Sequence, residues 1–358
     1  MFTNKFIVLF LIFLAPTIVI AANNAYQQHN LVSDGFAAAD FTDANMVNPW
    51  GLAFLPTGTN WINANGSGKS IVINGLGLEG LTVNMPIDPT MGNSVTPTGI
   101  AANNTSGWVI TNGSKSGVAL FLFSTENGQI LGWSPMVEPN MAIIAVNNST
   151  AGAVYKGLTI AADGKQSYLY ATNFYSGAVE VYDADFMPVV KPNAFMDPQI
   201  PKDFAPFGIQ NINGNIYVTY AQQDADKHDN ISGPGLGYVD VFDTNGKLLQ
   251  RVAANGPLNA PWGLALAPAN FGEFSNALLI GNFGDGKINA IDLVSKQFMG
   301  NLAGVNGGPL ILDGLWAISF GNGFKDQPPN FLFFTAGLAD ETHGLYGFIA
   351  PLEESASL

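Results

Sequence analysis

A short phrase recurs six times along this chain, and it constrains the fold more than any other feature. The clearest copies are PWGLAFLP at Pro49–Pro56 and PWGLALAP at Pro261–Pro268. The small residue at the centre of the phrase falls at Gly51, Gly99, Gly157, Gly208, Gly263 and Ala317, so that successive copies are 48 to 58 residues apart. A repeat of this length, built from short strands, is typical of propeller blades. The sequence therefore predicts an all-β, six-bladed β-propeller with four-stranded antiparallel blades.

Each repeat contains further strand patterns separated by turn residues. In blade five we expect strands at 263–267, 277–281, 287–292 and 296–302, with the turn sequence NFGDG after the second strand. In blade two the same reasoning predicts strands at 99–102, 108–111, 118–124 and 129–133. The small central residue has a packing reason, because six inner strands converge near the axis and bulky side chains would clash there.

The last repeat is incomplete. Its three strand patterns end at Ile349, and a polar tail follows. We expect the missing fourth strand to come from the other end of the chain, around Tyr26–Ser33. Such closure ties the termini together and removes open sheet edges.

The N-terminus has the pattern of a secretory signal peptide. A short polar start with Lys5 is followed by an apolar run, Phe6–Ile20, and by two small residues, Ala21 and Ala22. We therefore expect a signal peptide at 1–22, a propeller at 23–352 and a polar tail at 353–358. No later segment reaches 18 consecutive apolar residues, so no integral membrane segment is expected after cleavage. The predicted location is secreted or periplasmic.

The charge balance narrows the choice of partners. The formal net charge is −14, and only 11% of the residues are charged. An acidic surface disfavours nucleic acid as a partner. The chain has no Cys, and a core of this size needs no disulfides. We expect a monomer that binds a small molecule or a protein.

Polar residues recur where the second strand of a blade is expected to end. In four blades this residue is Asn, and loops that reach the same mouth of the channel add other amides and carboxylates. The predicted ligand-binding residues are Asn48, Asn65, Asn112, Asn173, Asn282 and Asp313. Such oxygens suit a hard cation such as Ca²⁺, for which Asn173, Asn282 and Asp285 are the candidate metal ligands. The alternative is that Asn only caps tight turns.

Aromatic residues are expected at the same mouth. Trp262 and Trp316 are included in the predicted ligand-binding set, because they could line a pocket for a flat ligand. The alternative is that they wedge between neighbouring blades.

Two residues near the C-terminus are the candidate catalytic pair. His343 follows Glu341 in the segment ADETHG, and a His–carboxylate pair at a channel mouth could act as a general acid or base. A second histidine, His228, lies in an acidic insertion of blade four with Asp229, where a solvated loop is the simpler interpretation.

Long phrases of the chain resemble one family. VNPWGLAFLPTG (Val47–Gly58), LLIGNFGDGKINAID (Leu278–Asp292) and LFFTAGLADETHGLYG (Leu332–Gly347) are similar to secreted bacterial proteins of unknown function, some of which carry a PEP-CTERM sorting tail. The resemblance implies an exported six-bladed propeller and no particular substrate. No PEP motif follows Leu352 here. LYATNFYSGAVEVYD (Leu169–Asp183) is more loosely similar to NHL-repeat and gluconolactonase-type propellers.

Two functions follow as hypotheses. The first is a propeller that binds a ligand or partner at one mouth of the central channel, with no assigned activity. The alternative is a calcium-dependent hydrolase of the lactonase or esterase type, with the metal at that mouth and His343 or Glu341 handling protons.

Overall fold

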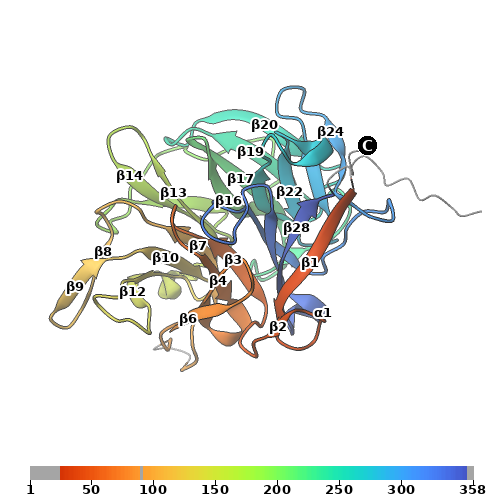
Figure 1. Cartoon of the computed structure of the whole chain (residues 1–358). Helices are drawn as coiled ribbons and strands as arrows, with labels where there is room; N and C mark the ends of the chain where they lie inside the picture. Colours follow the sequence, from red (N-terminus) through yellow and green to blue (C-terminus); the bar gives the residue numbers. More distant parts are fainter. Residues whose placement is uncertain (1–24, 89–91, 353–358) are drawn as a thin grey trace, which may run out of the picture.

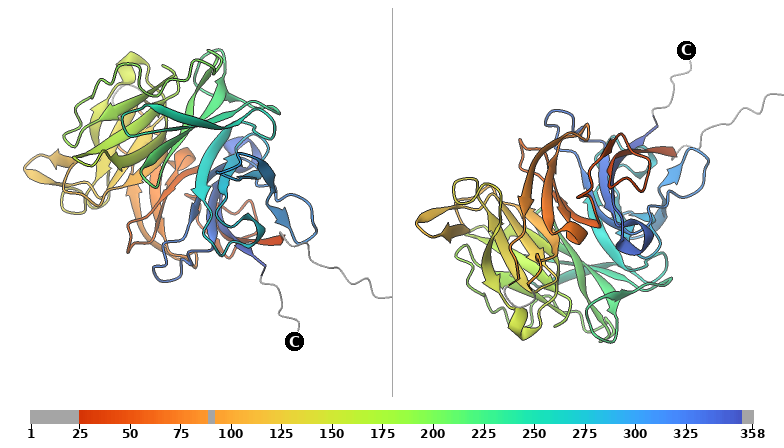
Figure 2. Two further views of the ribbon diagram at one scale, coloured as in Figure 1. Left: turned by 90° about the horizontal axis from the view of Figure 1, so that it is seen from above. Right: turned by 90° about the horizontal axis from the view of Figure 1, so that it is seen from below.

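The six repeats fold into six sheets around a common axis (Figure 1). The computed structural model describes residues 25–88 and 92–352, so the predicted signal peptide and the polar tail lie outside the described residues. The first strand of each blade contacts the first strands of its two neighbours, and β26 (Leu315–Phe320) contacts β3 (Pro49–Ala53) to close the ring. Figure 2 shows this arrangement from two opposite sides. The predicted fold class is confirmed.

Most blades have the expected four antiparallel strands. Blade one continues from β3 with β4 (Asn60–Ala64), β5 (Lys69–Ile73) and β6 (Glu79–Asn84); blade two has β7 (Pro97–Ala102), β10 (Phe121–Thr125), β11 (Gln129–Trp133) and β12 (Ile143–Asn147); blade three has β13 (Tyr155–Ala162), β14 (Ser167–Asn173) and β15 (Ala178–Tyr182); blade four has β16 (Phe204–Ile212), β17 (Asn215–Gln223), β19 (Tyr238–Phe242) and β20 (Leu248–Ala254); blade five has β21 (Pro261–Leu266), β22 (Leu278–Asn282), β23 (Ile288–Ile291) and β24 (Phe298–Asn301); blade six has β26, β27 (Leu332–Ala336), β28 (Leu345–Pro351) and β1 (Ala25–Ser33).

The predicted ring closure is confirmed. Strand β1 pairs antiparallel with β28, with Gln28 opposite Ile349, and so forms the outer strand of blade six. Two short strands, β2 (Phe41–Thr42) and β25 (Ala303–Gly304), pair in parallel with β1. The N-terminal strand therefore joins the last blade without leaving its third strand as an open edge.

The strand assignment predicted for blade two is wrong. The segment at 108–111 does not enter the blade; it forms β8 (Val109–Asn112), which pairs only with β9 (Lys115–Val118) in a separate hairpin. This hairpin projects from the ring in Figure 1. The second strand of blade two is β10, which the sequence pattern had placed third.

Apolar side chains fill the seams between blades. Six buried clusters each combine residues of two adjacent blades, and a seventh lies on the axis. Between blades six and one, for example, Phe333 and Tyr346 pack with Ile62 and Ile71. Burial of this apolar surface is the main force that holds the ring together.

Side-chain hydrogen bonds reach the first strand of the next blade across four seams; three of the donors lie on the second strand of their own blade and one on the first. The Thr335 hydroxyl donates to the carbonyl oxygen of Trp50 at 2.6 Å, and the Thr172 hydroxyl donates to that of Phe207 at 2.8 Å. Thr98 and Asn63 make similar bonds to the blade that follows their own. We call these bonds, together with the small residues of the first strands, the staple layer.

The central residue of the phrase is small because the backbone of the next blade lies against it. A Cβ at Gly208 would lie 2.1 Å from the carbonyl oxygen of Trp262, and one at Gly51 would lie 2.5 Å from that of Thr98. The prediction of crowding is confirmed, but the crowding comes from the next blade's backbone rather than from side chains on the axis.

Two segments extend over the face where the first strands begin. The insertion of blade four returns to its sheet through β18 (Asn230–Ile231), which pairs with the end of β17. The element α1 (Leu338–Glu341) connects β27 to β28, and Ala339, Asp340 and Glu341 have φ values of 51°, 51° and 64°. α1 is therefore a left-handed turn, a conformation that costs roughly 1–2 kcal/mol per residue for L-amino acids. The described residues also include the 3₁₀ turns η1 (Asn65–Ser67), η2 (Ser149–Ala151) and η3 (Gly272–Phe274). Within the described part of the chain, no helix has the length and apolar character needed to cross a membrane.

Candidate functional site at the closed mouth of the channel

Stacked aromatic rings close one end of the channel. Trp316 stacks on Trp50 with 3.5 Å between ring centroids, and Trp262 meets both indoles edge-on. We call this group the aromatic plug; its members are Trp50, Phe174, Phe207, Trp262, Phe283 and Trp316. The predicted aromatic residues do meet at one mouth, but they pack on one another on the axis and leave no slot between them for a flat ligand.

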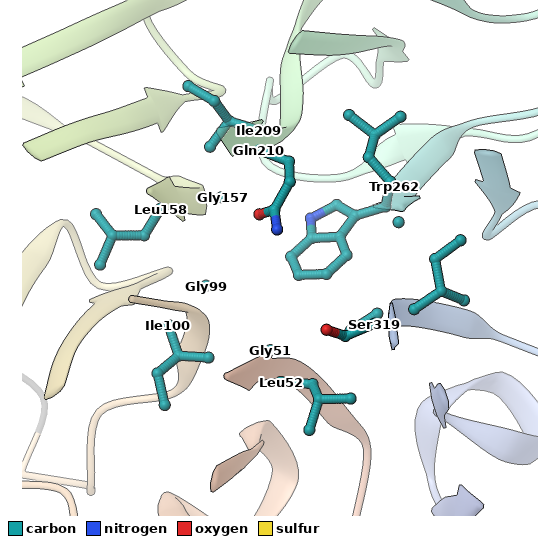
Figure 3. Close-up of a pocket in the computed structure, with 14 residues that line it drawn as sticks. Gly51, Leu52, Gly99, Ile100, Gly157, Leu158, Ile209, Gln210, Trp262 and Ser319 are labelled. Carbon is teal, nitrogen blue, oxygen red and sulfur yellow. The ribbon is translucent and has the colours of Figure 1, made fainter. Parts of the chain in front are cut away.

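Below the plug the channel contains a cavity of about 40 Å³ among the first strands, and the Trp262 indole and the Gln210 amide project into it (Figure 3). A second space of about 240 Å³, which shares Leu52, Gln210 and Ser319 with the first, continues to the opposite mouth. The two mouths therefore differ, one closed by aromatic rings and the other open.

A lysine breaks the aromatic pattern at the closed mouth. The residue before the small residue of the phrase is Trp50, Thr98, Phe207, Trp262 or Trp316 in five blades, but it is Lys156 in blade three. The Lys156 ammonium lies 5.0 Å from the Trp50 ring centroid and 5.9 Å from that of Phe174. Contacts of this kind with a ring face attract a cation.

Two carboxylates neutralise this buried ammonium. Lys156 Nζ donates to Glu126 Oε1 at 2.6 Å and to Asp229 Oδ1 at 3.2 Å. The Lys156 side chain is 1% exposed and that of Glu126 is 14% exposed, whereas Asp229 is exposed. Burial of such a pair is costly, so its presence at a mouth needs an explanation beyond stability.

The blade-four insertion supplies the outer part of this site. His228 Nδ1 lies 3.1 Å from Asp229 Oδ1, and the strand pairing of β18 with β17 places both residues over the lysine. We call Glu126, Lys156, His228, Asp229 and Glu341 the mouth cluster. The insertion is exposed at residues 225–229, as expected of a solvated loop, but Asp229 also connects it to Lys156 on the first strand of blade three.

The charges of the mouth cluster support one another. Burial alone would raise the pKa of Glu126, but the Lys156 ammonium and the Asn65 amide hold it below its ordinary value. Burial would likewise lower the pKa of Lys156, and Glu126 and Asp229 raise it above its ordinary value. The hydrogen bond between His228 and Asp229 raises the pKa of the histidine and lowers that of the aspartate. At neutral pH the Lys156–Glu126 pair is therefore fully charged.

Three of the predicted site residues do meet at this mouth. Asn48 Nδ2 donates to Glu341 Oε2 at 2.6 Å, and Trp316 Nε1 donates to Asn48 Oδ1 at 3.0 Å. Burial raises the pKa of Glu341, an effect that the Asn48 hydrogen bond partly offsets. The left-handed α1 turn thus presents a carboxyl group that is protonated more readily than an exposed glutamate.

The proposed catalytic pair is arranged differently from the prediction. The His343 ring donates from Nδ1 to Asp34 Oδ2 at 2.6 Å and stacks on Phe36. Glu341 instead bonds to Asn48, so the structure pairs each residue with a different partner. His343 therefore does pair with a carboxylate, but the partner is Asp34 of the β1–β2 connection and not Glu341.

The predicted ring of asparagines does not form a single set. Asn173 Oδ1 accepts from the backbone amides of Val154 and Ser176, while Asn282 Nδ2 donates to the Pro257 carbonyl and to Asp285. These are local bonds within or beside their own blades, as the turn-capping alternative predicts. Asp313 is exposed and accepts the backbone amide of Ala339.

One error of strand assignment and one of register explain why the asparagines do not form a ring. Asn112 is exposed in the β8–β9 hairpin and therefore lies outside the blade to which it was assigned. The β3–β4 and β7–β10 pairings place Asn65 and Glu126 at equivalent positions, one residue beyond those of Asn173 and Asn282. Asn65 Nδ2 donates to Glu126 Oε2 at 2.9 Å. Correct assignment of β10 would have placed Glu126 at the mouth.

The geometry bears on which residues could hold a metal. In the described part of the chain, one group of three His or carboxylate residues has its ligand atoms within 4.8 Å of one another: Glu126, His228 and Asp229. The Lys156 ammonium already shares oxygens of both acids, and it would repel a divalent cation placed there. We interpret Lys156 as the cation of this site. Asp285, one of the predicted calcium ligands, pairs with Lys287 at 3.0 Å.

A pocket opens beside the mouth cluster. Its volume is about 550 Å³, and it lies along the seam between blades two and three. Glu126 and His228 line it together with Ser149, Thr150, Ala153 and Val154. The buried ion pair thus adjoins a space large enough for a small ligand.

These features define the class of protein: a six-bladed β-propeller whose one closed mouth carries a buried, asymmetric ion-pair cluster beside a pocket. Solved structures share the fold. One is a catalytically inactive form of virginiamycin B lyase from Staphylococcus aureus with quinupristin, at 12% identity and TM-score 0.52 over 92% of this chain and 99% of that one. Another is a protein of unknown function from Bacteroides thetaiotaomicron, at 11% identity and TM-score 0.57 over 91% of this chain and 76% of that one. Likeness at this level of identity shows the fold alone.

The sequence comparisons identify a family. The chain is 33% identical to the uncharacterized protein R648 of Acanthamoeba polyphaga mimivirus over 89% of its length and 78% of that protein. It is 31% identical to the uncharacterized protein L690 of the same virus, over 88% and 83% respectively. The chain belongs to the family of these proteins. No family model matches it. The expected relatives were bacterial, and these relatives are instead viral.

Proposed function

We propose that this protein binds a small polar ligand in the pocket beside the mouth cluster, with Glu126 and His228 as the main polar contacts. The observation that carries the proposal is the buried Lys156–Glu126 pair. A buried ion pair is not needed to close the axis, because apolar replacements of buried ion pairs are often neutral or stabilising and four other blades have an aromatic residue at this position.

The chemistry of the pocket indicates the kind of ligand. Glu126 and His228 offer a carboxylate and an imidazole, and Thr96, Ser149 and Thr150 add hydroxyl groups around the rim. Ala153 and Val154 form an apolar wall. A ligand with several hydroxyl or amine donors and a compact apolar body fits this combination.

The position of the ion pair supports a role in holding the ligand-binding group. Glu126 Oε1 is held by Lys156 and Oε2 by Asn65, so that its carboxylate is fixed in orientation and charge before any ligand arrives. Preorganisation of this kind improves affinity, because little ordering remains to be done on binding. Glu341, whose carboxyl takes up a proton readily, extends the same surface toward α1.

A ligand screen with matched variants tests the proposal. Ligand-observed NMR with a panel of sugars, sugar lactones and amino acids would be run on the wild type, Asp229→Asn and Asp226→Asn. Both substitutions remove one carboxylate from the same exposed loop, but only Asp229 contacts Lys156 and His228. We expect a ligand whose signal is lost with D229N and kept with D226N. A ligand that both variants bind as the wild type does would contradict the proposal.

A further inference from the structure

A second pocket lies on the outer strands of blades two and three, and none of the mouth cluster residues lines it. Its volume is about 360 Å³, and its walls are apolar: Val146, Val179, Val181, Phe186 and Val189 line it. Asn148, Glu180 and Tyr182 provide its polar part. This combination of apolar walls and a few convergent polar groups is typical of small-molecule sites.

The Glu180 carboxylate is held by neutral donors. Tyr155 and Tyr182 donate their hydroxyls to Oε2 at 2.5 and 2.7 Å, and Asn173 Nδ2 donates to Oε1 at 2.7 Å. Asn148 Nδ2 in turn donates to both tyrosine hydroxyls, at 2.7 and 2.9 Å. All three donors to Glu180 and the Asn148 amide behind them are uncharged, so the network fixes the carboxylate without neutralising it.

No cation in the described part of the chain supplies the missing charge. Among the residues that the structure describes, none of the ion pairs within 4.0 Å includes Glu180. Lys191 also lines the pocket, but its ammonium donates to the Thr244 carbonyl at 2.9 Å and lies 4.4 Å from the Tyr168 ring centroid. A carboxylate beside apolar walls and without a cationic partner is complementary to an ammonium group on an apolar body.

We propose that this pocket binds a small apolar amine, with its ammonium at Glu180 and its apolar body against the valine and phenylalanine walls. The site uses none of the mouth cluster residues, so it stands independently of the function proposed above.

Calorimetry with two probes of equal shape tests this proposal. 2-Phenylethylamine is charged at pH 7, whereas 2-phenylethanol is neutral. We expect the wild type to bind the amine about tenfold more tightly than the alcohol, a difference typical of one paired charge that is partly buried. Glu180→Gln keeps the shape and a hydrogen-bonding amide, and we expect it to reduce the amine to the affinity of the alcohol.

Two further variants keep the result interpretable. Asp185→Asn removes an exposed carboxylate from the same segment without touching the pocket, and it should leave both affinities unchanged. Val179→Trp fills the pocket from its wall and should abolish binding of both probes. This variant tests the location of the site independently, should Glu180→Gln fail to fold. Equal affinity of the wild type for amine and alcohol, or no binding of either, would overturn the proposal.

Discussion

Two adjacent layers of the same repeat behave differently in this propeller. In the staple layer every blade keeps a small residue, and four seams have a side-chain bond to the next first strand. One residue earlier along each first strand, the mouth layer has three tryptophans, one phenylalanine and one threonine, and then Lys156. The regular layer is explained by backbone geometry alone. The irregular layer is where one blade departs from its repeat, and that departure gathers charged groups from four blades.

The largest expected effect is the loss of stability when the mouth layer loses the charge of Glu126, because the staple layer contains no such charge. Glu126→Gln leaves the buried Lys156 ammonium with only the exposed Asp229 as a charged partner. We expect a loss of about 3 kcal/mol in the free energy of unfolding, measured by urea denaturation. The double variant Glu126→Gln, Lys156→Met should recover most of that loss, because methionine can pack against the plug as apolar residues do in other blades.

A matched control decides whether burial is the cause. Glu79→Gln removes an exposed carboxylate from β6 and should change stability by less than about 0.5 kcal/mol. If Glu126→Gln costs no more than this control, the mouth pair behaves as a surface ion pair and the contrast between the layers fails.

The sequence predicts the regular layer well and the irregular layer poorly, for a physical reason. The spacing of Gly51, Gly99 and their equivalents reports a backbone contact that every blade must make, so six blades follow from it, and the missing fourth strand of the last repeat predicts the closing strand. Lys156 occupies a position where the repeat alone suggests an aromatic residue, and only the folded ring shows that Glu126 and Asp229 reach it.

The error in blade two has the same origin. The segment 108–111 has the composition of a strand, and it does form one, as β8 of a hairpin outside the blade. Local pattern cannot tell a blade strand from an inserted strand, because the difference lies in tertiary pairing. That error placed Asn112 at the mouth and hid Glu126, whereas Asn48, Trp316 and Glu341 were placed together correctly.

The second prediction probes the staple layer through its glycine. Gly208→Ala places a Cβ 2.1 Å from the Trp262 carbonyl oxygen, so one of the two strands must shift. We expect a loss of about 2 kcal/mol in the free energy of unfolding, a typical cost of overpacking. Gly308→Ala is the control, since its new methyl group meets no described atom within 4 Å. Equal stability of the two variants would show that the blades are free to spread.

The third prediction removes one staple bond. Thr335→Val keeps the shape of the side chain but deletes the hydroxyl that accepts from the Ala317 amide and donates to the Trp50 carbonyl. We expect a loss of about 1–2 kcal/mol, because two buried backbone groups lose a partner. Thr82→Val, at an exposed hydroxyl that bonds to Glu79, should cost less than about 0.5 kcal/mol. If Thr335→Val costs no more stability than Thr82→Val, the Thr335 hydrogen bond does not stabilise the closed ring.

The smallest expected effect depends on pH and belongs to the mouth layer alone. Asp229 raises the pKa of His228 above its ordinary value of 6.5, so the pair adds stability at lower pH and loses it as pH rises through the folded-state pKa. Because both side chains are about half exposed or more, we expect only about 0.5 kcal/mol, or a melting temperature difference of about 1 °C. The readout is the difference in melting temperature between the wild type and His228→Gln from pH 5.5 to pH 8.5. That difference should shrink as pH rises, whereas the deficits of Gly208→Ala and Thr335→Val should stay constant, since neither change involves a group that titrates in this range. A deficit of His228→Gln that is also constant would mean that the blade-four insertion is held over the mouth by its β18 pairing and not by charge.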